Sequence, residues 1–122
     1  MIMDLKRLIK SFADAWRGIV YVYQHEQNFK IQLFTAVIII FFMAVLKVRK
    51  NEMIVIFLLI LLVLILELIN SAMEKFLDIL KPRLHFHVAL VKDIMAAMVL
   101  LASAGTVAIG GYILLPYIFS II

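Results

Sequence analysis

The sequence predicts an all-α membrane protein, with an N-terminal amphipathic surface helix followed by three transmembrane helices. Hydrophobic residues make up 66% of the chain and the mean hydropathy is +1.14, far above the roughly half apolar usage of soluble domains. Residues 31–46 and 94–122 carry no charge, and residues 53–73 carry only Glu67. Each stretch approaches or exceeds the about 17 to 25 residues that a helix needs to cross a bilayer.

The 122 residues fit one domain. Within the first 25 residues, apolar side chains recur at steps of three and four from Leu5 to Tyr23, while charged side chains fill the opposite face. This pattern is typical of a helix that lies in the membrane interface, where Trp16 would serve as a headgroup-level anchor. We therefore expect a single domain over 1–122, with a surface helix over 4–25 and membrane spans over 30–48, 52–79 and 91–119.

The distribution of basic residues predicts the orientation in the membrane. The net charge is +4. With three spans, nine of the twelve basic residues fall on one side of the membrane, before or at the start of the first span and in or near the connection between the second and third. The other three, Lys47, Arg49 and Lys50, lie on the opposite side, at the turn between the first two spans. By the positive-inside rule, we expect the N-terminus in the cytoplasm and the C-terminus outside. Basic charge at helix ends favours lipid headgroups and phosphates as partners, and not nucleic acid. The first twenty residues lack the apolar run of a cleavable signal peptide.

Polar side chains enter the second span at its cytoplasmic end. Because successive residues of a helix are about 100° apart, five of these side chains fall within an arc of roughly 100°: Glu67, Asn70, Ser71, Glu74 and Asp78. Charged residues such as Glu74 and Asp78 are ordinary where a span enters the headgroup region. Glu67 follows fourteen uncharged residues, and a carboxylate near hydrocarbon is costly unless it has a partner or a task. Glu67 is therefore a candidate functional residue.

The residue types limit the chemistry. The sequence has no cysteine, which excludes thiolate catalysis and sulfur-ligated metals and leaves oxygen and imidazole ligands, suited to hard cations such as Mg²⁺. Neither GxxxxGK[ST] nor GxGxxG occurs, so a P-loop is excluded. A bound nucleotide would need carboxylate-bound magnesium and basic side chains. The available groups are Glu26, Glu74, Arg7 and Lys92.

Several motifs together resemble a known family. The run from Glu67 to Asp78, ELINSAMEKFLD, and the pair Lys92-Asp93 resemble the ELxNxAxExxxD and KD signatures of the prokaryotic integral-membrane diacylglycerol and undecaprenol kinases. Nearer the N-terminus, RLIK from Arg7, WRG from Trp16 and EQNFK from Glu26 also resemble that family's pattern. The resemblance covers nearly the whole chain.

This resemblance implies a homotrimeric helical bundle that transfers the ATP γ-phosphate to a membrane lipid alcohol, with Mg²⁺ as cofactor. The product would be undecaprenyl phosphate or phosphatidic acid. By the same likeness Glu67 is the catalytic base, and Asn70 and Trp16 join it in contacting the lipid substrate. Glu26 and Glu74 are the implied magnesium ligands. These two carboxylates also belong to the implied nucleotide site, whose other members are Arg7, His85, Lys92 and Asp93.

Two positions depart from the family pattern. Asp14 and Leu84 stand where aromatic residues are usual, so the source of base stacking for ATP is open. The stretch Gln27-Asn28-Phe29 resembles the undecaprenol-kinase branch and favours undecaprenol as acceptor.

Two other functions fit the composition. Glu67 and Asn70 would line the pathway of a small oligomeric ion channel or proton-coupled transporter. In a structural membrane subunit, the polar face would instead bind a partner helix. Small residues on one side of the third span, Ala97, Ala104, Ala108 and Gly111, favour packing against copies of the same chain in each case.

Overall fold

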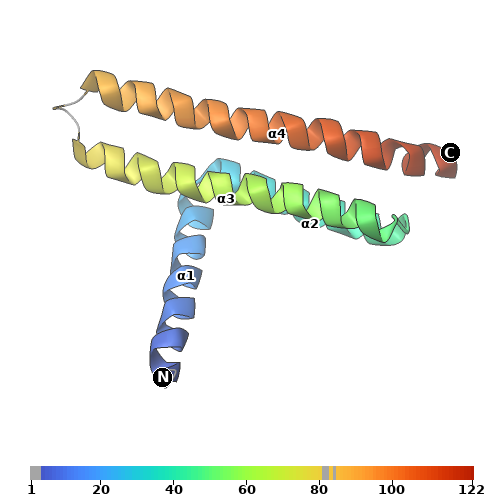
Figure 1. Cartoon of the computed structure of the whole chain (residues 1–122), viewed down its shortest axis with the longest axis horizontal. Helices are drawn as coiled ribbons and strands as arrows, with labels where there is room; N and C mark the ends of the chain where they lie inside the picture. Colours follow the sequence, from blue (N-terminus) through green and yellow to red (C-terminus); the bar gives the residue numbers. More distant parts are fainter. Residues whose placement is uncertain (1–3, 81–82, 84) are drawn as a thin grey trace.

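The computed structural model describes residues 4–80, 83 and 85–122. It consists of four helices, α1 (Leu5–His25), α2 (Gln27–Val45), α3 (Lys50–Leu80) and α4 (His85–Ile121). In Figure 1, α2, α3 and α4 run side by side along the long axis, whereas α1 leaves the bundle crosswise near the start of α2. Lys81, Pro82 and the unusual Leu84 lie outside the described residues.

The amphipathic helix α1 begins at a side-chain cap. The Asp4 carboxylate accepts backbone N–H groups of Lys6 at 3.1 Å and Arg7 at 3.3 Å, which satisfies donors that a helix N-terminus would otherwise leave unpaired. Its apolar side chains are largely uncovered by protein: Trp16 is 66% exposed and Phe12 is 71% exposed. Such a face suits a helix that rests in the membrane interface.

A single residue separates α1 from α2. Glu26 has extended dihedral angles, φ −114° and ψ 110°, and it ends one helix while opening the next. Its N–H donates to the Val22 carbonyl at 2.8 Å, and its carbonyl accepts from the Lys30 N–H at 3.2 Å. The corner turns the chain from the direction of α1 into that of the bundle (Figure 1). Its carboxylate makes no capping bond to α2 and is left for other partners.

The connection between α2 and α3 is short because α2 ends in a Schellman-type turn. Lys47 has a left-handed φ of 54°, and the Val48 N–H donates back to the Met43 carbonyl at 3.2 Å. Met43 and Val48 are both buried in the same apolar cluster, which supplies the hydrophobic contact that accompanies this motif. As a result α2 ends at Val45, three residues before the expected end of the first span.

Helix α3 lies between α2 and α4 and carries the core. Buried residues of α2, α3 and their connection form one cluster, which side chains from the last third of α4 cover. Its members are Ala36, Met43, Val48, Ile56 and Ile60. Most other large apolar side chains are exposed, as expected where lipid is the solvent.

Among the described residues, three helices are long and apolar enough to cross a membrane, namely α2, α3 and α4, with 19, 31 and 37 residues. This confirms the all-α fold with three candidate spans. At about 1.5 Å per residue, α3 is roughly 46 Å long and exceeds a hydrocarbon core of about 30 Å. Part of α3 must therefore extend into the interfacial region. Helix α4 begins at His85, six residues before the expected start of the third span.

Polar groups at one end of the bundle tie α4 to the start of α3. The Tyr117 hydroxyl donates to the Glu52 carboxylate and accepts the Arg49 backbone N–H at 3.2 Å. The Arg49 guanidinium is also paired with Glu52, at 3.8 Å. We call Arg49, Glu52 and Tyr117 the far-end cluster.

Candidate active site

Glu67 is buried inside the helical bundle, with only 5% of its surface exposed. It lies on α3, and its carboxylate interacts with the Gln32 amide of α2 and with the carboxylates of Glu26 and Glu74. A buried carboxylate beside two others is electrostatically unfavourable unless a cation or a proton is supplied. This position suits a group that takes part in chemistry better than one that only stabilises the fold.

Weak hydrogen bonds join the other polar residues of this end. The Ser71 hydroxyl, which is 3% exposed, donates to Glu26 at 3.4 Å and so connects the α1–α2 corner to α3. The Asn70 amide donates to Glu74 at 3.4 Å, one turn further along α3. The position of Glu26 between α1 and α2 thus lets its carboxylate reach Ser71 on the polar face of α3. We call Glu26, Glu67, Asn70, Ser71 and Glu74 the near-end cluster.

The near-end cluster contains oxygen ligands but no complete metal cage. Across residues 4–80, 83 and 85–122, no group of three or more His, Asp or Glu side chains could hold a metal ion on its own. Magnesium in phosphoryl-transfer sites is bound by one or two carboxylates together with substrate phosphates and water. Glu26 and Glu74, which both interact with Glu67, therefore fit a magnesium that arrives with a nucleotide.

The start of α4 places basic and acidic groups beside the end of α3. Lys92 Nζ lies 2.9 Å from Asp78 Oδ1, and so joins α4 to the last turns of α3. Asp93, the next residue, is exposed, as is His85, the first residue of α4. These three expected nucleotide-binding residues all lie in the first three turns of one helix.

Two expected site residues stay apart from the near-end cluster in the single chain. Arg7 lies in the first turn of α1 and Trp16 in its middle, both exposed. Helix α1 runs away from the bundle towards the N-terminus (Figure 1). One chain therefore does not bring Arg7 to Glu67.

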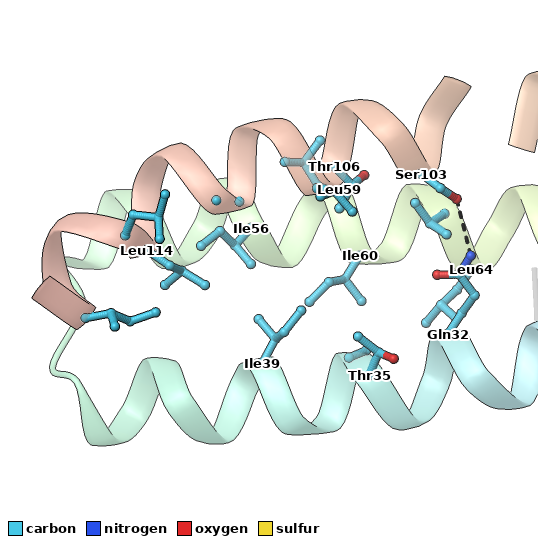
Figure 2. A pocket seen from close by; sticks show the side chains of 17 residues that line it. Gln32, Thr35, Ile39, Ile56, Leu59, Ile60, Leu64, Ser103, Thr106 and Leu114 are labelled. Carbon is cyan, nitrogen blue, oxygen red and sulfur yellow. Dashed lines mark hydrogen bonds between the residues drawn. The ribbon is translucent and has the colours of Figure 1, made fainter. Parts of the chain in front are cut away.

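A polar contact within the span was not foreseen from the sequence. Gln32 Nε2 donates to Ser103 Oγ at 3.2 Å, across 71 residues of chain. Both side chains line a cavity of about 330 Å³ between α2, α3 and α4, whose other lining residues are mostly apolar (Figure 2). The available signal was that Gln32 and Thr35 are the polar residues within the uncharged stretch 31–46.

The comparison with protein families decides the identity. The model of the family described as prokaryotic diacylglycerol kinase matches residues 13–114. The chain belongs to this family. This confirms the resemblance drawn from the sequence motifs. Kinases of this family take phosphate from ATP and have a lipid alcohol as acceptor.

Two curated relatives agree with this membership. A diacylglycerol kinase of Synechocystis sp. is 36% identical over 115 residues, which cover 93% of this chain and 66% of the relative, just under two thirds. An undecaprenol kinase of Bacillus subtilis is 32% identical over 113 residues, covering 93% of this chain and 92% of the relative. Both names denote lipid kinases. Neither comparison supports the channel, transporter or structural-subunit alternatives.

Proposed function

We propose that this member of the prokaryotic diacylglycerol kinase family transfers the γ-phosphate of ATP to the hydroxyl of undecaprenol or diacylglycerol. The observation that carries the proposal is the burial of the Glu67 carboxylate beside two further carboxylates. Both named relatives act on a lipid alcohol. Undecaprenol is the favoured acceptor because the stretch Gln27-Asn28-Phe29 resembles that branch.

Glu67 is the proposed general base. The lipid hydroxyl oxygen attacks the γ-phosphorus, the bond between that phosphorus and the β,γ-bridging oxygen breaks, and ADP leaves. The hydroxyl proton passes to the Glu67 carboxylate. No phosphoenzyme forms, since the acceptor oxygen itself takes the phosphoryl group. Asn70 contacts the lipid headgroup, and its amide donates to Glu74 on the nucleotide side.

Glu26 and Glu74 are the proposed magnesium ligands. The metal would neutralise the charge of the ATP phosphates, which is the main demand of phosphoryl transfer. The single-residue corner at Glu26 leaves its carboxylate without a helix-capping bond, and Ser71 steadies it. Lys92, Asp93, His85 and Arg7 complete the proposed nucleotide site.

A homotrimer is proposed as the working assembly. Ala97, Ala104 and Ala108 on α4 are exposed, whereas Gly111 lines the cavity between α2, α3 and α4. Such small-residue surfaces let helices approach closely in membranes. A neighbouring copy could also bring its Arg7 and Trp16 to a site that one chain leaves incomplete.

The proposed topology has the near-end cluster and the N-terminus in the cytoplasm of a bacterial inner membrane and the C-terminus outside. The excess of basic residues at the near end supports it. Cytosolic ATP would then meet Lys92 and Asp93 at the membrane surface, while the lipid alcohol reaches Glu67 from the bilayer.

The direct test uses purified protein, magnesium ATP, and undecaprenol and diacylglycerol presented separately in micelles. We expect phosphorylated lipid with at least one acceptor and faster turnover with undecaprenol. Vesicles containing the same protein should show no ion conductance. Conductance without phosphorylation of either lipid would replace the kinase by the channel alternative.

A further inference from the structure

Side chains from three helices meet at the buried carboxylate. Gln32 of α2 donates its Nε2–H to Ser103 Oγ of α4 at 3.2 Å (Figure 2). The same amide interacts with the Glu67 carboxylate of α3. Glu67 is almost fully buried, and Gln32 and Ser103 are partly buried. One amide thus joins all three candidate membrane spans at the depth of Glu67.

We propose that Gln32 is a positioning residue for the reaction: Ser103 fixes its amide, and the amide orients the Glu67 carboxylate. This rests on the proposed function, in which Glu67 accepts the hydroxyl proton. It extends that function by assigning roles to two residues outside the polar face of α3 and the signature motifs.

The donor and acceptor chemistry fits this role. A glutamine amide has two N–H donors, whereas an ionised carboxylate can only accept. Gln32 can therefore give one N–H to Ser103 and the other to Glu67. A carboxylate held through one contact keeps its remaining lone pairs for the substrate hydroxyl. Because few polar groups are available within a span, a Glu67 without Gln32 would have less to fix its direction.

A second polar residue at the same cavity provides a contrast. Thr106 lies one turn beyond Ser103 on α4 and also lines the cavity. Its hydroxyl donates to the Ala102 carbonyl of its own helix at 2.7 Å. The Thr106 hydroxyl therefore bonds within α4 and makes no hydrogen bond to Gln32. It is the matched control for loss of a hydroxyl at this cavity.

The contact also links the base to the helix of the nucleotide side. Lys92 and Asp93 lie on α4, and Ser103 follows Lys92 by eleven residues, roughly 16 Å along the axis. A displacement of α4 would move Ser103, and through Gln32 it would turn the Glu67 carboxylate. Gln32 therefore makes correct orientation of the base depend on the position of α4.

The test compares Gln32→Met, Ser103→Ala, Ser103→Thr, Thr106→Ala and the double variant Gln32→Met/Ser103→Ala in the full-length protein. Methionine keeps the length of glutamine and removes its hydrogen bonds. Each variant is assayed for kcat, for KM with ATP, and for thermal unfolding in detergent.

We expect Gln32→Met to lower kcat roughly 10- to 100-fold, the scale of a misplaced catalytic group, with KM for ATP unchanged. Ser103→Ala should lower kcat less, Ser103→Thr should restore most of that loss, and the double variant should be no slower than Gln32→Met. Thr106→Ala should match the parent. Full kcat in Gln32→Met, or losses that multiply in the double variant, would overturn the proposal.

Two further comparisons keep the outcome decisive. If Gln32→Met does not fold, the Ser103→Ala and Ser103→Thr pair decides, because an equal loss in both would remove the hydroxyl from the mechanism. Glu67→Gln is measured alongside. Activity in Glu67→Gln would end the base role on which the proposal rests. An inactive Glu67→Gln beside a fully active Gln32→Met would overturn the positioning role alone.

Discussion

The polar residues at the two ends of the helical bundle differ in how well their charges are matched. In the far-end cluster, the Glu52 carboxylate is matched by the Tyr117 hydroxyl and the Arg49 guanidinium, and the groups contact one another closely. In the near-end cluster, the Glu67 carboxylate instead interacts with the carboxylates of Glu26 and Glu74. The hydrogen bonds of Glu26 and Glu74 there measure 3.4 Å, beyond the usual range of about 2.7 to 3.2 Å.

This difference separates a structural cluster from a functional one. The Glu52 carboxylate is neutralised by a cation and accepts a hydrogen bond from a hydroxyl, and these contacts hold α4 against α3. Repulsion among neighbouring carboxylates lowers the stability of the fold unless a cation or a proton binds to them. Proteins keep such destabilising arrangements at sites where activity requires them. The near end is therefore the end at which we expect substrates to bind, and the far end is the one at which we expect stability to be lost on mutation.

The largest expected effect comes from mixing inactive chains. In the proposed homotrimer, a neighbouring subunit brings Arg7 to the site that contains Glu67, so Arg7→Gln and Glu67→Gln chains should complement each other. Random mixing in equal amounts would give about a quarter of the interfaces an intact Arg7 opposite an intact Glu67. Lipid phosphorylation by trimers purified through two different tags measures this. Mixed assemblies as inactive as either parent would place the whole site within one chain.

A smaller effect is expected when one metal ligand is lost. Glu74→Gln should raise the magnesium concentration needed for half-maximal rate by about 10-fold, since one of two proposed carboxylate ligands becomes a neutral amide. The measurement is a magnesium titration of lipid phosphorylation at fixed ATP. Glu52→Gln is the control, because it removes a carboxylate at the other end. An unchanged magnesium dependence in Glu74→Gln would take Glu74 out of the metal site.

Orientation of the two ends can be tested with little effect on the protein. The chain has no native cysteine, so Arg83→Cys and Ser120→Cys each introduce a unique thiol at an exposed residue. We expect a membrane-impermeant maleimide to label position 83 only from the cytoplasmic side and position 120 only from outside. Labelling of both from one side would contradict the proposed topology, and labelling of position 83 from outside would separate Lys92 from cytosolic ATP.

The sequence could predict the features that depend on local pattern. Uncharged stretches reveal spans because each helix must be apolar along its length, and the 3.6-residue period places Glu67, Asn70 and Glu74 on one face. The break at Glu26 was located only to within a few residues, because it depends on one extended residue between two helices.

Contacts between distant residues could not be predicted in the same way. Gln32 and Ser103 are 71 residues apart, and Glu52 and Tyr117 are 65 apart. Such pairs depend on how three helices pack, and a lone Gln or Tyr in an apolar stretch does not identify its partner. Arg7 is the opposite case. Its motif can be recognised in the sequence, but the fold of one chain does not bring it to Glu67.

The contrast between the two ends is tested most directly by one paired measurement. Glu67→Gln and Tyr117→Phe are purified side by side and assayed for lipid phosphorylation, ATP affinity and thermal unfolding. We predict that Glu67→Gln loses on the order of 10²- to 10⁴-fold in turnover, the contribution of a general base, while its ATP affinity and unfolding midpoint stay close to those of the parent. Tyr117→Phe should keep its turnover and lose about 1 kcal/mol of stability, the worth of a hydrogen bond. An active Glu67→Gln, or a folded Tyr117→Phe without activity, would contradict the account.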